Sequence, residues 1–118
     1  MSIDKDNRDG ATYQCELADI ANETAKYVGF NAQFATKDFN VLYDYLGEGY
    51  GVVSDLEREA IRLLASREGI ILDPVYTRRA MGALIALIRN KAFRSDETVL
   101  FWHTGGAPAL FSYAKDLI

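Results

Sequence analysis

The chain has 118 residues, a hydrophobic fraction of 49%, a charged fraction of 25% and a formal net charge of −4. These values are typical of one ordinary globular domain. The 13 Lys and Arg residues are scattered along the sequence. We therefore expect no nucleic-acid partner, because phosphate binding requires a concentrated basic surface. Cys15 is the single cysteine, which leaves no intrachain disulfide and no thiolate metal site, and we expect no metal.

The sequence predicts a cytoplasmic protein without a membrane segment. The first ten residues are polar and lack the apolar core of a signal peptide. The longest apolar run, residues 80–88, is far too short to cross a bilayer. A lone cysteine also fits a reducing compartment.

Residues 1–10 carry many charges without periodicity and are predicted to form a flexible leader, followed by a single α/β domain over residues 11–118. The three-and-four spacing of apolar residues predicts an amphipathic helix over residues 11–28, which Gly29 ends. The predicted buried face of this helix consists of Tyr13, Leu17, Ile20, Ala21, Thr24, Tyr27 and Val28.

Residues 41–46 have the composition of a strand, and a glycine-rich turn follows. Ser54 and Glu57 form a capping-box pattern at the start of the next helix, which Gly69 closes. We expect the charged residues Glu57, Arg58 and Arg62 to form a solvated face of this helix.

Residues 70–72 are predicted to form a short buried segment before the turn at Asp73 and Pro74. A helix that is apolar on most sides is predicted from Thr77 to Arg89 and requires cover by other elements. After a turn at residues 94–97, the apolar run 99–102 predicts a central parallel strand covered on both faces. Pro108 suits the first position of the last helix, over residues 109–117.

This order of elements predicts an α/β fold with a small parallel sheet flanked by helices. Two strands make a poor sheet, and the apolar helix after Thr77 requires more cover than they provide. The chain therefore reads as part of a larger α/β domain or as one partner of an obligate assembly.

Two loop-to-helix junctions, residues 73–77 and 103–110, carry the candidate chemistry, because hydroxyl groups and backbone N–H groups converge at such junctions. His103 is the single histidine. It could act as a general base, although a structural role is the commoner use of a lone histidine at a strand end. Thr77 and Thr104 lie beside helix starts, where helix capping is the default role of a hydroxyl.

Tyr50 and Tyr76 lie in turns that are bounded by glycine or proline. A tyrosine in such a turn can act as acid, base or nucleophile when a neighbouring cation lowers its pKa. The alternative is an aromatic lid packed over a loop. These residues by themselves describe a cleft lined by hydroxyl groups without a committed reaction.

Several blocks in register resemble one enzyme family. They are Gly49-Tyr50-Gly51-Val52, Glu59 to Ala65, Glu68-Gly69-Ile70, Leu72 to Thr77 and His103 to Phe111. Over about residues 41–113 the chain resembles the C-terminal part of the D-cysteine desulfhydrase and 1-aminocyclopropane-1-carboxylate (ACC) deaminase family. The resemblance implies pyridoxal phosphate (PLP) as cofactor and part of the three-layer sandwich known as fold type II, related to the tryptophan synthase β-subunit.

The same resemblance implies site residues. Tyr50 and Tyr76 would line the substrate pocket as catalytic residues, and Thr77, Thr104, His103, Gly105 and Gly106 would contact the cofactor. Threonine at positions 77 and 104 resembles the desulfhydrases, because the deaminases have glutamate and leucine there. A neutral hydroxyl near the pyridine nitrogen suits β-elimination of D-cysteine or a related small amino acid.

Two departures from the family pattern bear on function. Val53 stands in place of a usual proline, and Arg78-Arg79 in place of a usual Gly-Lys pair, which adds bulk and charge beside the expected site. The resemblance implies that the Schiff-base lysine and the phosphate-binding loops are missing, because in the family they lie in the N-terminal two thirds, which this chain does not match. Its five lysines, Lys5, Lys26, Lys37, Lys91 and Lys115, match no family motif.

We therefore expect a fragment or subunit that is inactive by itself and that requires a homo-oligomer or a partner polypeptide. The alternative is a free-standing binding or oligomerisation module, which the unmatched residues 1–31 favour. A relic of a truncated gene is the third possibility.

Overall fold

The computed structural model describes residues 2–3, 10–45 and 54–117. The chain divides into two compact units, Met1–Leu46 and Gly47–Ile118. Each is described by itself, and the prediction of one domain over residues 11–118 stays a prediction. Tyr50, Val53 and the glycine-rich turn before them lie outside the described residues.

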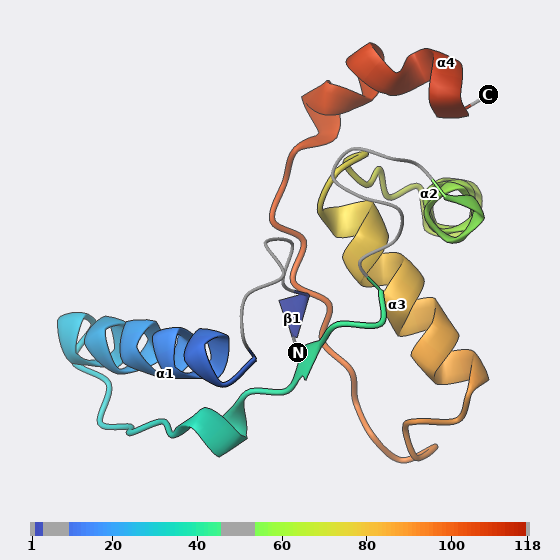
Figure 1. The fold of residues 1–118 in the computed structure, drawn as a ribbon. Coiled ribbons are helices and arrows are strands. Elements are labelled where there is room, and N and C mark those ends of the chain that lie inside the picture. Colours follow the sequence, from blue (N-terminus) through green and yellow to red (C-terminus); the bar gives the residue numbers. More distant parts are fainter. Residues whose placement is uncertain (1, 4–9, 46–53, 118) are drawn as a thin grey trace. The chain divides into compact units, whose positions relative to one another are not determined.

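The first unit is built on helix α1, Gly10–Tyr27 (Figure 1). Gly29 adopts a left-handed conformation with φ of 70° just after the helix. The Phe30 N–H donates to the Ala25 carbonyl at 2.8 Å across this turn. This is the glycine-dependent helix end that the sequence predicted.

The buried face of α1 differs from the predicted one. Ala18 and Ala25 are its buried residues, whereas Ile20, Tyr27 and Val28 are 61%, 91% and 65% exposed. The residues after α1 fold back along it and are held by polar side chains. Asn22 exchanges hydrogen bonds of 2.8 and 2.9 Å with the Phe34 backbone, and Gln14 Nε2 donates to the Phe39 carbonyl at 2.7 Å. The returning segment packs closely against the face of α1 that carries Ala18 and Ala25, and the larger apolar side chains lie on the solvent-exposed faces.

The folded-back segment contains the short 3-10 helix η1, Thr36–Asp38, and strand β2, Val41–Leu42. Strand β1, Ser2–Ile3, pairs with β2 in parallel, with Ser2 opposite Val41. Thus two residues of the predicted leader form a strand. The strand predicted over residues 41–46 is shorter than expected, because its partner spans two residues and a turn begins at Asp44.

The second unit is built on α2, Asp55–Glu68, packed against α3, Thr77–Arg89 (Figure 1). The predicted capping box of Ser54 and Glu57 and the left-handed Gly69 after α2 are both confirmed. Gly82 permits close helix contact, since a Cβ there would lie 3.0 Å from Leu56 Cγ. The buried apolar core consists of Ala60 of α2, Met81 and Leu84 of α3, and Leu72 of the segment between the helices. The prediction of a buried segment over residues 70–72 holds for Leu72 but is wrong for Ile70 and Ile71, which are 45% and 50% exposed.

The C-terminal part forms the 3-10 helix η2, Ala107–Tyr113, and the short helix α4, Ala114–Leu117, where the sequence predicted one α-helix. Pro108 lies in the first turn, as expected. The central strand predicted over residues 99–102 is wrong for this structure: the segment has no ladder, and Leu100 and Trp102 are 80% and 77% exposed. A strand needs neighbours for its N–H and C=O groups, and no described strand pairs with this segment.

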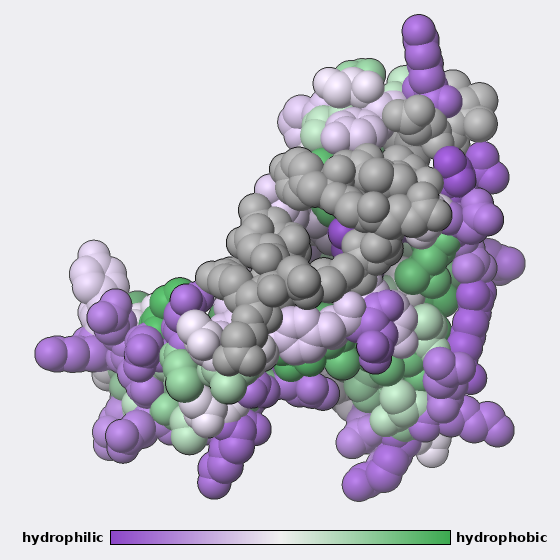
Figure 2. Space-filling view, viewed as in Figure 1, coloured by the Kyte–Doolittle hydropathy of each residue, from purple (hydrophilic) through white to green (hydrophobic). Residues whose placement is uncertain are grey.

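Large apolar side chains reach the surface in both units, and the space-filling view shows hydrophobic areas among the hydrophilic ones (Figure 2). Within the described part of the chain, no helix has the length and apolar character needed to cross a membrane.

Candidate functional site

The turn from Asp73 to Thr77 is organised by one buried carboxylate. Asp73 Oδ1 accepts hydrogen bonds from the N–H groups of Val75 and Tyr76, at 2.8 and 2.7 Å. Asp73 Oδ2 accepts from the backbone N–H and the hydroxyl of Thr77, at 2.5 and 2.6 Å. The Asp73 N–H in turn donates to Thr77 Oγ1 at 2.8 Å. The carboxylate therefore accepts from the first N–H group of α3, that of Thr77, and from the two N–H groups before it. The Arg78 N–H donates to the Asp73 backbone carbonyl at 3.3 Å.

Asp73 and Thr77 are 1% and 2% exposed. Burial raises the pKa of Asp73, but the hydrogen bonds from Thr77, Tyr76 and Val75 outweigh it and hold the pKa below its ordinary value. Asp73 is thus an ionised acceptor at neutral pH. Tyr76 is the N-cap of α3 and makes no side-chain capping hydrogen bond. The expected capping role is therefore wrong for Thr77, whose hydroxyl bonds to Asp73 instead, and its predicted contact with the cofactor stays a prediction.

His103 connects two extended segments of the second unit. Its Nδ1 accepts a hydrogen bond from the Gly105 N–H at 3.0 Å, so Nδ1 carries a lone pair. Nε2 lies 2.9 Å from the Ile71 carbonyl oxygen and must therefore carry the hydrogen. Both ring nitrogens are engaged in the neutral tautomer, which matches the structural role considered for this residue.

The glycine pair lies against the Asp73 turn. Gly105 and Gly106 have φ angles of 94° and 92°. A Cβ on Gly106 would lie 2.7 Å from Asp73 Cβ, whereas one on Gly105 would meet nothing within 4 Å. The two junctions that the sequence indicated therefore lie side by side. The hydrogen bond from His103 to the Ile71 carbonyl and the close packing of Gly106 against Asp73 bring them together.

The other predicted site residues are placed differently. Tyr76 is 52% exposed beside the Asp73 turn, and Thr104 is exposed in the extended segment before the glycine pair. The predicted catalytic Tyr50 lies outside the described residues. The roles predicted for these three residues stay predictions.

The charged residues after Thr77 are buried. Arg78 and Arg79 are 0% and 8% exposed, and Glu57 is 1% exposed. Arg79 Nε donates to Glu57 Oε1 at 2.9 Å. The expectation of a solvated face is therefore wrong for Glu57, because Arg79, 22 residues later, covers it. Burial chiefly lowers the pKa of Arg78, and the negative charges of Glu57 and Asp73 oppose that shift.

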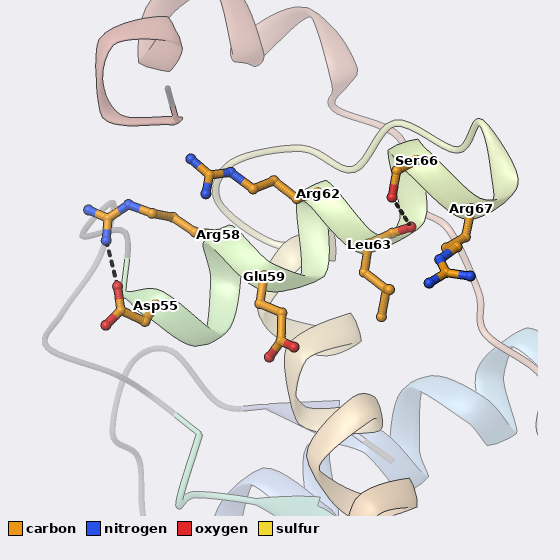
Figure 3. A pocket seen from close by; sticks show the side chains of 7 residues that line it. All are labelled: Asp55, Arg58, Glu59, Arg62, Leu63, Ser66 and Arg67. Carbon is orange, nitrogen blue, oxygen red and sulfur yellow. Dashed lines mark hydrogen bonds and ion pairs between the residues drawn. The ribbon is translucent and has the colours of Figure 1, made fainter.

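Among the described residues, two surface hollows lie away from these turns. One, of about 490 Å³, follows the outer face of α2 and is open to solvent (Figure 3). Its lining residues are Asp55, Arg58, Glu59, Arg62, Leu63, Ser66 and Arg67. The other, of about 530 Å³, lies in the first unit after α1. Neither is lined by a predicted site residue.

Comparison with known proteins assigns the class. A family model for pyridoxal-phosphate dependent enzymes matches residues 4–105, and the chain belongs to this family. It is 56% identical over 79 residues to the D-cysteine desulfhydrases of Salmonella newport (strain SL254) and Salmonella heidelberg (strain SL476). A crystal structure of an ACC deaminase homologue superposes with a TM-score of 0.70 and 35% identity, over 93% of this chain. The resemblance inferred from the sequence blocks is thereby confirmed.

The matches cover this chain far more fully than they cover its relatives. The 79 matched residues are 67% of this chain but 24% of either desulfhydrase, and the superposition covers 32% of the deaminase homologue. The family match begins at residue 4. Residues 4–31 therefore lie inside the matched region, which removes the sequence argument for a free-standing module.

The described residues fit one side of a PLP site. Hydroxyl groups and a close glycine turn suit the edge and face of a pyridine ring. All four described lysines, Lys26, Lys37, Lys91 and Lys115, are exposed. Lys91 follows α3 at the end opposite Thr77, about 20 Å along the helix axis. Among the described residues, the candidate site contains no amine that could bind the cofactor aldehyde.

Sequence reasoning missed two features. The first is the set of hydrogen bonds that the Asp73 carboxylate accepts, for which the signal is an aspartate at the start of a turn, because such a side chain commonly bonds to the backbone N–H groups that follow it. The Glu57–Arg79 pair had no local signal, because it joins two helices across 22 residues of sequence.

Proposed function

We propose that this chain supplies one wall of a PLP-dependent lyase that eliminates the β-substituent of D-cysteine or a related small amino acid. The 56% identity to D-cysteine desulfhydrases carries this proposal. The contact between the turn at residues 73–77 and the segment at residues 103–106 supports it, since these segments hold six of the seven predicted site residues. Threonine at positions 77 and 104 favours elimination over ACC deamination.

PLP, when bound, would supply an electron sink for the α-carbon of the amino acid, which is next to the β-carbon that carries the leaving group. The role of this chain is to bind and orient. Tyr76, exposed at the start of α3, would face the substrate, with Tyr50 as the second tyrosine. Thr77 and Thr104 would meet the ring edge, and His103 would hold the Gly105–Gly106 turn against the ring face.

The remaining parts of the site would come from another polypeptide or from further sequence in the same protein. The missing parts are the Schiff-base lysine and the phosphate-binding loop. In the assembled domain we expect the three-layer sandwich of fold type II, in which residues 99–102 gain strand neighbours. The exposed Leu100 and Trp102 support this expectation, because exposed large apolar side chains commonly mark a surface that another protein segment covers. A homo-oligomer is the other arrangement that would cover it.

The first experiment is a PLP titration of the purified chain, followed by visible absorbance, borohydride reduction and mass spectrometry. We expect no stoichiometric adduct on a single lysine and no sulfide release from D-cysteine. A specific adduct on one lysine would show that this chain forms a complete site and would contradict the expected inactivity.

The second experiment mixes the chain with a Salmonella desulfhydrase from which the matched C-terminal quarter has been removed. We expect sulfide release from D-cysteine in the mixture and none from either part. Tyr76→Phe in this chain should abolish the gain, whereas Tyr27→Phe, a substitution in the first unit at a 91% exposed residue, should leave it unchanged. A well-mixed, folded pair that releases no sulfide would count against the proposed function.

A further inference from the structure

The hydrogens around Thr77 can be counted. The Asp73 N–H can only donate, so it occupies one lone pair of Thr77 Oγ1. Asp73 Oδ2 lies 2.6 Å from the same hydroxyl. Because the carboxylate already accepts from three backbone N–H groups, it is held in its ionised form and can only accept. The single hydroxyl hydrogen of Thr77 is therefore donated to Asp73.

This count leaves the Thr77 hydroxyl with one lone pair and no hydrogen. From the geometry we propose that Asp73 is a positioning residue that makes Thr77 a hydrogen-bond acceptor only, so that a ligand must present an N–H or O–H group to it. This inference rests on the proposed function for the identity of the ligand. With PLP, the group that meets Thr77 would be a protonated ring nitrogen.

Asp73 also sets the position of the opposite segment. A Cβ atom added to Gly106 would lie only 2.7 Å from Asp73 Cβ, so the Gly105–Gly106 turn packs directly against Asp73. The Asp73 carboxylate also interacts electrostatically with the buried guanidinium of Arg78 on α3. One carboxylate thus fixes the direction of the Thr77 hydroxyl and the approach of the Gly105–Gly106 turn.

The direction of the Thr77–Asp73 hydrogen bond can be tested without a ligand. The measurement is the pKa of the Asp73 carboxyl group, obtained from the pH dependence of its carboxyl carbon NMR signal in the full chain and in Thr77→Val. If Thr77 donates, removal of its hydroxyl shifts the pKa of Asp73 upward, and Thr77→Ser restores the original value. A downward shift in Thr77→Val would mean that Asp73 donates to Thr77 and would overturn the proposal.

A measurement on the unaltered chain covers the case in which Thr77→Val does not fold. In the 13C-labelled protein, a coupling through the hydrogen bond should join the Thr77 hydroxyl proton to the Asp73 carboxyl carbon. A hydroxyl proton that shows no such coupling and exchanges freely with water would overturn the proposal equally well.

The ligand arm uses 4′-deoxypyridoxine 5′-phosphate, which has the ring nitrogen and phosphate of PLP but cannot bind a lysine covalently. We expect it to bind the complemented enzyme with its ring nitrogen protonated to a higher pH than in water, and with about tenfold weaker affinity in Thr77→Val. A bound probe with an unprotonated ring nitrogen would overturn the proposed ligand contact. A probe that does not bind would count against the proposed function, while the carboxyl titration would still decide the direction of the hydrogen bond.

Discussion

Arg79 Nε donates to Glu57 Oε1 at 2.9 Å and so joins the first turn of α3 to the first turn of α2 inside the second unit. The side chains of both residues are nearly buried, at 9% and 2% exposure. Glu57 Oε2 also accepts from the Ser54 N–H at 2.7 Å and from the Ser54 hydroxyl. One carboxylate therefore caps α2 and pairs with α3.

Breaking this pair should destabilise the chain strongly. Arg79→Met leaves the Glu57 charge buried without its guanidinium partner, and we expect a loss of about 3 kcal/mol in the free energy of unfolding. Urea denaturation measures the loss. The double variant Glu57→Gln/Arg79→Met should recover part of it, because no uncompensated charge remains.

The matched control is the exposed pair between the same two helices. Arg89 contacts Glu59 at 2.6 and 2.8 Å, with side-chain exposures of 56% and 44%. Arg89→Met should change the midpoint of denaturation much less, since exposed ion pairs contribute little. Equal losses of unfolding free energy in Arg79→Met and Arg89→Met would show that burial of the ion pair does not determine its contribution to stability.

Acid should destabilise the second unit through Glu57 and Asp73. Burial raises the pKa of Glu57, but the hydrogen bonds from Ser54 and Arg79 and the charge of Arg79 hold it below 4.5. The pKa of Asp73 is likewise held below 3.8. Groups with a lowered pKa in the folded state contribute stability above their unfolded pKa, and this is lost as pH falls through the folded pKa.

The measurement is the free energy of unfolding between pH 7 and pH 2.5. We expect little change down to about pH 5 and a steep decline below about pH 4.5. Glu57→Gln should flatten the decline, at a lower stability throughout. A stability that is constant over this range would show that neither carboxylate is coupled to folding.

The end of α3 offers a stabilising substitution. Lys91 adopts a φ of 56°, and the N–H groups of Lys91 and Ala92 close the helix on Ile88 and Leu87 at 3.0 Å each. This turn favours glycine at the left-handed position. Lys91→Gly should therefore stabilise the chain by about 1 kcal/mol, measured by thermal denaturation.

Gly69 supplies the opposite test at the end of α2, where φ is 67° and a Cβ would meet nothing within 4 Å. Gly69→Ala should destabilise the chain by about 1 kcal/mol through backbone strain alone. Substitutions at both positions that shift stability in the same direction would contradict the conformational explanation.

The two glycines of the candidate site should differ. Both have a φ near the same left-handed value, so Gly105→Ala should destabilise by about 1 kcal/mol through strain. Gly106→Ala adds a clash with Asp73 Cβ and should destabilise more, by roughly a further 1–3 kcal/mol. Urea denaturation compares the two variants. A smaller loss at Gly106 would argue against the close contact with Asp73.

Local signals in the sequence predicted α1, α2 and α3 well. Ser54 with Glu57, Gly69 and Gly29 fix where helices begin and end, because caps depend on residues within one turn. The Asp-Pro turn before Thr77 sets the start of α3 for the same reason. The residue blocks also indicated the enzyme family, which the comparisons confirm.

Strands and burial could not be predicted in the same way. Residues 99–102 have the composition of a central strand, yet a strand exists only where a neighbour accepts its hydrogen bonds. The stripe of Ile20 and Tyr27 on α1 has the right period, but Ala18 and Ala25 are buried, because the returning chain packs there.

The sequence by itself determined the caps, the extents of α1, α2 and α3 and the family, since each depends on residues close together in the chain or on matching blocks. Tertiary structure alone decided that Glu57 is buried against Arg79 and that Gly106 rests on Asp73, 33 residues earlier. It also decided that the Thr77 hydroxyl has already donated its hydrogen. These relationships arise when segments with no common sequence period meet in space and share one buried charge.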